Sequence, residues 1–395
     1  MSVQAFSSIL SSAGIKLSSM LMVVVFAKHM SEEGFGLFSY GFSMIVTLAT
    51  FISYAIGQTW GKLGSENKSK KLVAPLVIFW GGLAFTLSVL ITFWAGYPVN
   101  LILIVSLSSV LAMLSYSGQF VSLYLGRYKF ALLSSSAAVL LFVLLLIVLA
   151  FGLLKLNHEN AFVFLVVFYL VQAPAWLSLL SVLSNEGGKA VGFRWVSNVS
   201  AKYATLSLMG APVHFLCLTM LALYSGVNDV GSFNLSFQLY VATIFCVASL
   251  QPVMLKSFAG KGLSRVGAYV LFSIIVVAAS VFGYWFLGQM FSCSDISLLC
   301  LDEKVVAMPF VCALLAGNNT ILMQYINANY DPSVNIKLQA FYACLYFMFS
   351  VFFLWYGLGV TGLYAAIIVS SLLLLIFQIL AIRRMADEYC STGVV

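Results

Sequence analysis

The chain has 395 residues, of which 62 % are hydrophobic and only 8 % are charged, and its formal net charge is +7. Because a soluble protein carries roughly 25 % charged residues, this composition excludes a mainly soluble chain and favours an integral membrane protein whose outer surface faces lipid. The basic excess fits lysine- and arginine-rich cytoplasmic loops, and nucleic acid is excluded as a partner because no basic stripe with interleaved aromatics lies outside the apolar runs.

Twelve apolar runs follow one another along the chain, each long enough to cross a bilayer as a helix of about 20 residues. We therefore expect an all-α integral membrane protein in which short loops join successive antiparallel helices. The runs lie near residues 5–29, 35–59, 72–95, 100–125, 130–153, 161–184, 203–225, 231–255, 266–290, 305–328, 338–356 and 362–382.

A polar stretch near the middle divides these runs into two groups of six. We expect an N-terminal six-helix bundle over residues 1–184, a cytoplasmic linker over 185–202, and a C-terminal six-helix bundle with a short cytoplasmic tail over 203–395. The two groups look like copies, because three residue types coincide at an offset of 195 residues, about half the chain length. These pairs are Gly36 and Gly231, Phe38 and Phe233, and Phe42 and Phe237. Copies of six helices each have parallel topology.

The distribution of basic residues predicts the orientation in the membrane. With the N-terminus inside, the inner loops and tail hold fifteen lysines and arginines, and the outer loops hold three, Lys28, Lys155 and Lys304. This positive-inside bias predicts that both termini are cytoplasmic.

No motif for catalysis or for a bound cofactor stands out. The sequence has no Walker A motif, no G-x-S-x-G elbow, no H-E-x-x-H motif and no Cys/His cluster at metal-ligand spacing. We therefore expect no enzyme activity, no cofactor and no metal site. Cys293 and Cys300 share an outer loop and can pair if that side is oxidising, a question that the sequence leaves open.

The first run carries a lysine near its middle, where a basic residue costs roughly 2.5–3.5 kcal/mol. Ser8, Ser12, Lys16 and Ser19 recur at helical spacing and form one polar stripe. The stripe favours a wet central cavity with Lys16 and Ser12 on its wall. The alternative is that the serines bond their own backbone while Lys16 snorkels to the interface.

Polar side chains also recur at helical spacing in three later runs. The second run carries Ser43 and Thr47 in a row of hydroxyls, and the eighth carries Gln238. The seventh carries His214, the nearest counterpart of Lys16 in the second half, and Pro212 predicts a bend there. A membrane histidine is as readily a hydrogen bonder between helices, and both interpretations stay open.

The acidic residues are informative because all twelve fall in predicted loops or in the tail. A carrier of cationic drugs, or one coupled to sodium or protons by a buried carboxylate, is expected to keep an acid in a span. A cavity with cationic but no acidic side chains suits an anionic, phosphate-bearing substrate. The hydroxyls and amides beside it suit a sugar, whose OH groups need partners away from bulk water.

Three segments resemble the O-antigen flippases (Wzx) and wider polysaccharide transporters of the MOP superfamily. They are Glu33-Gly34-Phe35-Gly36-Leu37-Phe38-Ser39, Asp229-Val230-Gly231-Ser232-Phe233 and Leu358-Gly359-Val360-Thr361-Gly362-Leu363-Tyr364. The resemblance implies two MATE-like six-helix bundles. It also implies that basic residues of the first helix bind a diphosphate. Lys16 is such a basic residue, and Lys28 and Arg127 are further candidates. Ala211, the residue equivalent to Lys16 in the second half, is not basic.

The resemblance implies a flippase of the bacterial inner membrane, acting in lipopolysaccharide or related polysaccharide biosynthesis. Its substrate would be an undecaprenyl-diphosphate-linked oligosaccharide, moved from the cytoplasmic to the periplasmic leaflet by alternating access. Expected partners are this lipid-linked diphosphate, membrane lipids and the polysaccharide polymerase machinery. The alternatives are a multidrug or small-solute antiporter of the same superfamily and a membrane polysaccharide polymerase, which the short outer loops disfavour. The sugar, the coupling ion and the oligomeric state cannot be deduced from the sequence.

Overall fold

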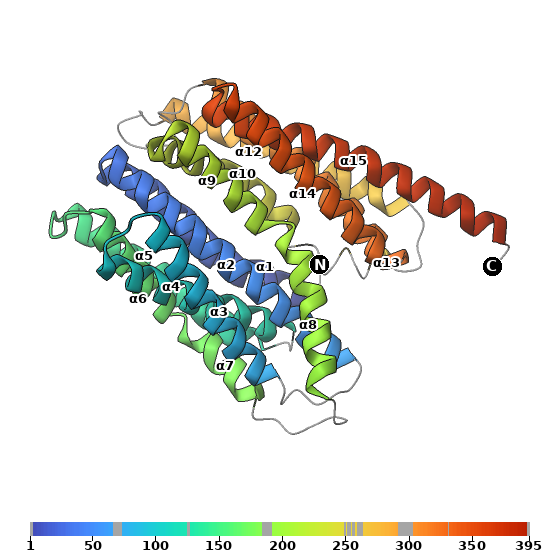
Figure 1. Cartoon of the computed structure of the whole chain (residues 1–395), viewed down its shortest axis with the longest axis horizontal. Coiled ribbons are helices and arrows are strands. Elements are labelled where there is room, and N and C mark those ends of the chain that lie inside the picture. Colours follow the sequence, from blue (N-terminus) through green and yellow to red (C-terminus); the bar gives the residue numbers. More distant parts are fainter. Residues whose placement is uncertain are drawn as a thin grey trace. The chain divides into compact units, whose positions relative to one another are not determined.

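The computed structural model is helical, with no β-strand in the part of the chain that it describes (Figure 1). Two compact units divide the chain at residues Met1–Thr219 and Met220–Val395. The predicted all-α membrane fold is confirmed. The described residues are 3–65, 73–124, 127–183, 192–248, 250, 254, 257–258, 264–290, 303–330 and 332–392. Cys293 and Cys300 lie outside them.

The helices of the first unit include α1 to α8 and the first part of α9, and the second unit contains the remainder. In the first unit the bounds are α1 (Val3–His29), α2 (Glu32–Ser65), α3 (Val73–Trp94), α4 (Val99–Tyr124), α5 (Tyr128–Ala150), α6 (His158–Leu170), α7 (Ala173–Leu183) and α8 (Phe193–Leu208). They continue with α9 (Ala211–Ser225), α10 (Val227–Ala248), α12 (Ser264–Met290), α13 (Glu303–Asn329), α14 (Pro332–Trp355) and α15 (Gly359–Thr392).

Every apolar run that the sequence predicts coincides with a helix or with a pair of helices. Eight helices in the described part are long and apolar enough to cross a membrane by themselves. Helices α1 and α10 account for two more runs. The sixth run is divided into α6 and α7, and the seventh into α8 and α9, the latter at the bend that Pro212 predicts.

The break between α6 and α7 was not expected, and it follows from Pro174, which lacks a backbone N–H and cannot continue a helix. The side chain of Ser134, from α5, satisfies backbone groups at this break. Its hydroxyl donates to the carbonyl of Gln172 at 3.2 Å and accepts from the N–H of Ala175 at 2.9 Å. The N–H of Ala175 also bonds to the carbonyl of Gln172 at 3.0 Å, so the serine hydroxyl reinforces a turn whose backbone groups already pair, which matters where an unpaired group costs several kcal/mol.

Helix α2 is central in the first unit, where it packs against α3, α4 and α8. Helices α8 and α9 lie along α2. Near the start of α2, the hydroxyl of Tyr40 is 3.2 Å from the hydroxyl of Thr219, on α9. Near the other end the indole of Trp80, on α3, donates to the hydroxyl of Ser200, on α8, at 3.0 Å. Residues 193–202, which the sequence assigns to the linker, form the first turns of α8.

An aromatic cluster links the second and sixth spans of the first unit. Phe38 stacks on Phe42 with ring centres 5.7 Å apart and an interplanar angle of 15°. Phe38 also packs against Phe162 of α6 at 5.4 Å.

The second unit repeats this cluster between the eighth and twelfth spans. Phe233 stacks on Phe237 at 5.3 Å and 23°, and it packs against Tyr364 of α15 at 4.8 Å. The residues that coincide in the sequence therefore have the same local geometry, which supports the predicted duplication.

Helices α5 and α14, the fifth helix of each predicted copy, end in the same way. Each is followed by a glycine with a positive φ, +66° at Gly152 and +73° at Gly357. The N–H of each glycine bonds to the carbonyl three residues before it, and the next N–H bonds to the carbonyl five residues before it. This cap satisfies terminal carbonyls, and glycine adopts its left-handed conformation without a Cβ penalty.

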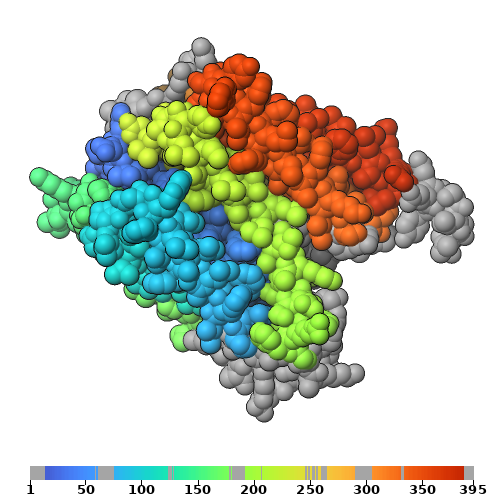
Figure 2. Space-filling view, viewed as in Figure 1, coloured from blue at the N-terminus to red at the C-terminus, as the bar shows by residue number. Residues whose placement is uncertain are grey.

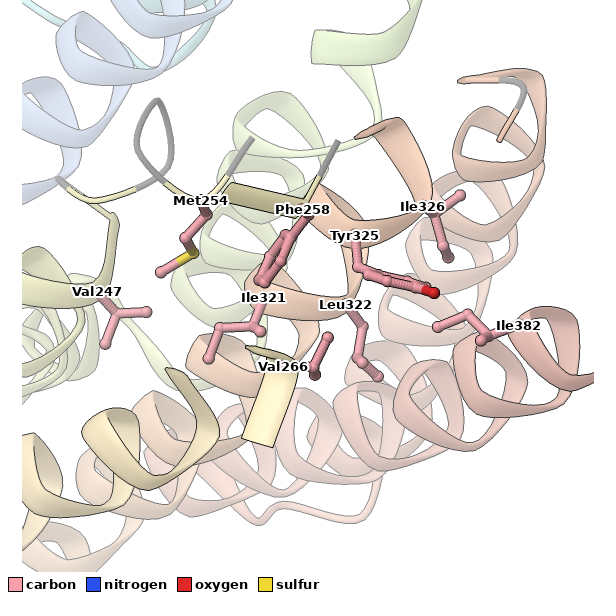
Figure 3. Packing of buried hydrophobic residues seen from close by; sticks show 9 residues of the cluster. All are labelled: Val247, Met254, Phe258, Val266, Ile321, Leu322, Tyr325, Ile326 and Ile382. Atoms are coloured by element: carbon pink, nitrogen blue, oxygen red, sulfur yellow. The ribbon is translucent and has the colours of Figure 1, made fainter. Parts of the chain in front are cut away.

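The core of the second unit lies between α12, α13, α15 and the residues that follow α10 (Figure 3). The ring of Phe258 meets Tyr269 and Tyr325 edge-on, at 5.2 and 5.8 Å. Buried amides join α13 and α15: Asn319 donates to an α15 carbonyl at 3.0 Å, and Gln378 donates to the carbonyl of Asn319 at 3.2 Å. Such bonds hold helices together where apolar contact with lipid offers no advantage to association.

The close approach of α4 to α7 predicts a position that tolerates only glycine. A Cβ on Gly118 would overlap the carbonyl oxygen of Ala175, a backbone atom that cannot rotate away. We expect Gly118→Ala to destabilise the protein by about 1–3 kcal/mol, measured as a lower Tm in detergent. The matched control is Gly82→Ala on α3, where a Cβ meets open space. Equal melting temperatures for the two variants would contradict this packing.

The role of Ser134 at the α6–α7 break gives a second prediction. We expect Ser134→Ala to cost about 0.5–1.5 kcal/mol, because the buried N–H of Ala175 and the buried carbonyl of Gln172 each lose one of two partners. Amide hydrogen exchange should accelerate locally at Ala175. Ser108→Ala serves as the control, since that hydroxyl bonds only to the carbonyl of Ile104 in its own helix. Unchanged exchange at Ala175 would show that the break does not depend on Ser134.

Candidate functional site

Lys16 stands at the centre of α1, thirteen residues from each end of the helix. At 1.5 Å per residue each end is about 20 Å away, which argues against snorkelling to either interface. Its side chain is exposed, and it projects beside the buried face that carries Ile15 and Phe26. The most exposed face of α1, with Leu17 and Leu21, lies on the other side of it.

The serines near Lys16 use their hydroxyl protons within α1. Ser19 donates to the carbonyl of Lys16 at 2.9 Å, and Ser18 donates to the carbonyl of Gly14 at 2.7 Å. For Ser19 the alternative interpretation, a hydroxyl bonded to its own backbone, is therefore correct. Ser12 lies on α1, but its side chain is outside the described part.

On α2, Ser43 is half-buried and Thr47 is buried. Three residues before Ser43, Tyr40 packs its ring on Phe215 of α9 at 5.2 Å and approaches the hydroxyl of Thr219. Tyr40 is not among the residues that the sequence singles out, because its importance depends on which helix lies beside α2. The row of hydroxyls on α2 therefore continues directly into a polar contact with the seventh span.

A second missed residue is Tyr97, in the turn between α3 and α4. Its hydroxyl donates to the carbonyl of Leu37 at 2.6 Å. Burial raises the pKa of the Tyr97 phenol, so the group stays protonated and remains a donor. It fixes the first turns of α2, and no sequence pattern distinguishes it from an interfacial tyrosine.

His214 lies in the first turn of α9, directly after the break that divides the seventh span. Its side chain is half-buried, and its backbone N–H donates to the backbone carbonyl of Gly210 at 3.1 Å. It belongs to the first unit, together with Lys16, Ser43 and Thr47.

The remaining candidates are Lys28, Arg127 and Gln238. Lys28 is exposed in the last turn of α1, about 18 Å along the helix from Lys16. Arg127 is half-buried in the turn before α5. Gln238 lies in the second unit, where its amide donates to the carbonyl of Asn234 in its own helix at 3.0 Å. A single phosphate held by Lys16 is therefore out of reach of Lys28.

The acidic residues that the structure describes all lie at helix starts or in the C-terminal part of α15. They are Glu32, Glu33, Glu159, Asp229, Glu303, Asp387 and Glu388. Asp229 is partly buried in the first turn of α10, and burial raises the pKa of its carboxyl. Within the same described part, no group of three His, Cys, Asp or Glu side chains could hold a metal ion.

Comparison with known proteins gives relatives that are similar over nearly the whole chain, although no family profile matches. The EPS I polysaccharide export inner membrane protein EpsE of Ralstonia solanacearum is 26 % identical, over 91 % of this chain and 88 % of that protein. The protein of the same name from Ralstonia nicotianae is 24 % identical, over 92 % and 89 %.

Solved structures show the same architecture at low sequence identity. The lipid II flippase MurJ in an inward closed conformation has a TM-score of 0.68 and 12 % identity, over 96 % of this chain and 87 % of that one. An outward-facing multidrug MATE transporter of the MOP superfamily has a TM-score of 0.65 and 12 % identity, over 98 % and 96 %. The resemblance noted in the sequence is confirmed: the chain has the fold of MOP-superfamily transporters, and its curated relatives are polysaccharide export proteins.

Proposed function

We propose that this protein is a flippase that moves an undecaprenyl-diphosphate-linked oligosaccharide, an O-antigen or similar repeat unit, from the cytoplasmic to the periplasmic leaflet. The observation that carries the proposal is the pattern of charge. An exposed lysine stands at the middle of α1, whereas the described acids lie at helix starts or in the tail. A transporter built in this way would stabilise an anion inside the membrane, and the middle of its described spans offers a cation no carboxylate.

The substrate's two chemical parts match two kinds of side chain in the first unit. The diphosphate would bind the ammonium of Lys16 through charge-assisted hydrogen bonds. The hydroxyls of Ser43 and Thr47 and the imidazole of His214 would bind sugar hydroxyl groups. The names of the curated relatives, which refer to polysaccharide export, support this class of substrate. Alternating access of the two bundles would expose the substrate to each leaflet in turn.

The proposal also includes the setting in which the protein acts. It is a transporter and not an enzyme, and it lies in the bacterial inner membrane with both termini in the cytoplasm. Its neighbours in the reaction sequence are the enzymes that assemble the lipid-linked unit and the polysaccharide polymerase machinery that receives it.

Replacement of Lys16 tests the diphosphate role. In a strain that lacks the gene, we expect Lys16→Ala to reduce surface polysaccharide by about tenfold or more, because a hydrogen bond to a charged group is lost. Lys16→Arg, which keeps the charge, should restore part of the activity. Lys155→Ala, an exposed lysine in the loop after α5, is the control.

The same strains distinguish the alternatives, provided that immunoblots show equal amounts of each variant. Full restoration of surface polysaccharide by Lys16→Ala would refute the role of the lysine. A deletion strain that keeps its surface polysaccharide but changes its sensitivity to drugs would identify an antiporter. Accumulation of single units on the periplasmic side would identify a polymerase, whereas loss of a flippase leaves them on the cytoplasmic side.

Reporter fusions test the orientation. A fluorescent protein that folds only in the cytoplasm should fluoresce when fused to the C-terminus. Alkaline phosphatase, which requires an oxidising compartment, should be active when inserted after Gly152, between α5 and α6. The reverse pattern would place both termini in the periplasm.

A further inference from the structure

Helix α8 carries a polar face that the proposed substrate site does not use. Its residues recur at helical spacing, and every one of them is exposed: Arg194, Asn198, Ala201, Lys202 and Thr205. We name the four polar members, Arg194, Asn198, Lys202 and Thr205, the α8 stripe. Figure 2 shows α8, in yellow-green, at the surface of the viewed face beside α3, in blue.

The packing of α8 fixes the direction of this stripe. The opposite face of the helix carries Val196, Ser200 and Ala204, which are buried. It rests on α2 and α3, and the hydroxyl of Ser200 accepts the indole N–H of Trp80 at 3.0 Å. The stripe is thus held outward by a buried face, and its cations do not depend on a flexible segment for their position.

The length of the seventh span sets the depth of the stripe. Together α8 and α9 extend over 33 residues, about 50 Å, whereas the hydrocarbon core is about 30 Å thick. The apolar run begins directly after Lys202, so Lys202 lies at the level of the lipid head groups. Arg194 lies eight residues farther toward the cytoplasm, about 12 Å along the helix.

This depth separates two kinds of lipid head group. The head-group layer is only about 5–8 Å thick on each side, so the phosphate of an ordinary phospholipid lies much nearer to Lys202 than to Arg194. A saccharide attached to a diphosphate extends farther into the cytoplasm and meets Asn198 and Arg194 as well. The exposed Lys129 and Arg265 differ, because each stands within the first two residues of its helix and no polar helix face continues outward from it.

We propose that the α8 stripe is a cytoplasmic loading site for the phosphate–sugar head group of a polyprenyl lipid. Lys202 binds the diphosphate, and Asn198 and Arg194 donate hydrogen bonds to the sugar units beyond it. The proposal rests on the proposed function and deepens it: it adds a site outside the membrane core at which the substrate binds before it reaches Lys16.

Binding measurements on the full-length protein in nanodiscs test this site. The probes are undecaprenyl diphosphate carrying a disaccharide, undecaprenyl diphosphate without sugar, and phosphatidylglycerol. We expect R194Q/K202Q to weaken binding of the saccharide lipid about tenfold to thirtyfold. Binding of phosphatidylglycerol should weaken much less. Asn198→Ala should weaken binding of only the probe that carries sugar. The matched control is Lys129→Gln, which replaces an exposed lysine at the start of α5. This variant should bind all three probes as the wild type does.

Each contrary result has a definite meaning. Equal losses for all three probes would show that the stripe binds anionic lipid in general and would overturn the proposal, as would unchanged binding of the saccharide lipid. If the R194Q/K202Q variant binds and transports the repeat unit as well as the wild type does, the proposed loading site is refuted and the flippase function stands. If the wild type binds no saccharide lipid, both fail. Equal Tm values confirm that the exposed substitutions leave the fold intact.

Discussion

The bilayer requires every backbone N–H and C=O within it to find a partner inside the protein, and the other features of this fold depend on that requirement. It explains why the described chain is helical and why each interruption is repaired locally. At the α6–α7 break Ser134 supplies both a donor and an acceptor. At the α8–α9 break the N–H of Gly210 bonds to the carbonyl of Ser207, and the helix resumes with the N–H of His214 bonded to Gly210.

The same solvent changes what holds helices together. Large apolar side chains gain nothing by leaving lipid, so they cover the outside, as Phe282 and Trp285 do on α12. Small and polar residues occupy many of the other contacts between helices, beside the aromatic clusters and the apolar core of the second unit. A Cβ on Gly14 would overlap the Ser135 side chain, and the buried hydroxyls of α3 and α4 pair as Ser88 with Ser109 at 3.2 Å. The number of buried serines in the first unit is therefore a consequence of helix packing and is no sign of a site.

The sequence predicts the helices well, because bilayer thickness dictates the length of every apolar run. It predicts the bend at Pro212 but neither the break at Pro174 nor the helical extension over residues 193–202. A hydropathy average hides both: the break lies within an apolar run, and α8 looks like a polar linker because only one of its faces is buried. At the site, the central place of Lys16 could be predicted from its position in the run. The contact of Tyr40 with Thr219 could not, because the pattern in one helix does not say which helix lies beside it.

The distribution of charge gives the proposed mechanism its physical logic. An ammonium at the centre of a span is costly, and so is a diphosphate moved out of water. In the proposed mechanism each would offset the cost of the other at Lys16, so the favoured substrate would be the one that neutralises the site. A carboxylate in the same spans would pair with Lys16 permanently and remove this preference. In the proposed mechanism the described acids at the helix starts and in the tail would contribute to selectivity, because no carboxylate in the middle of the described spans would compete with the substrate for Lys16.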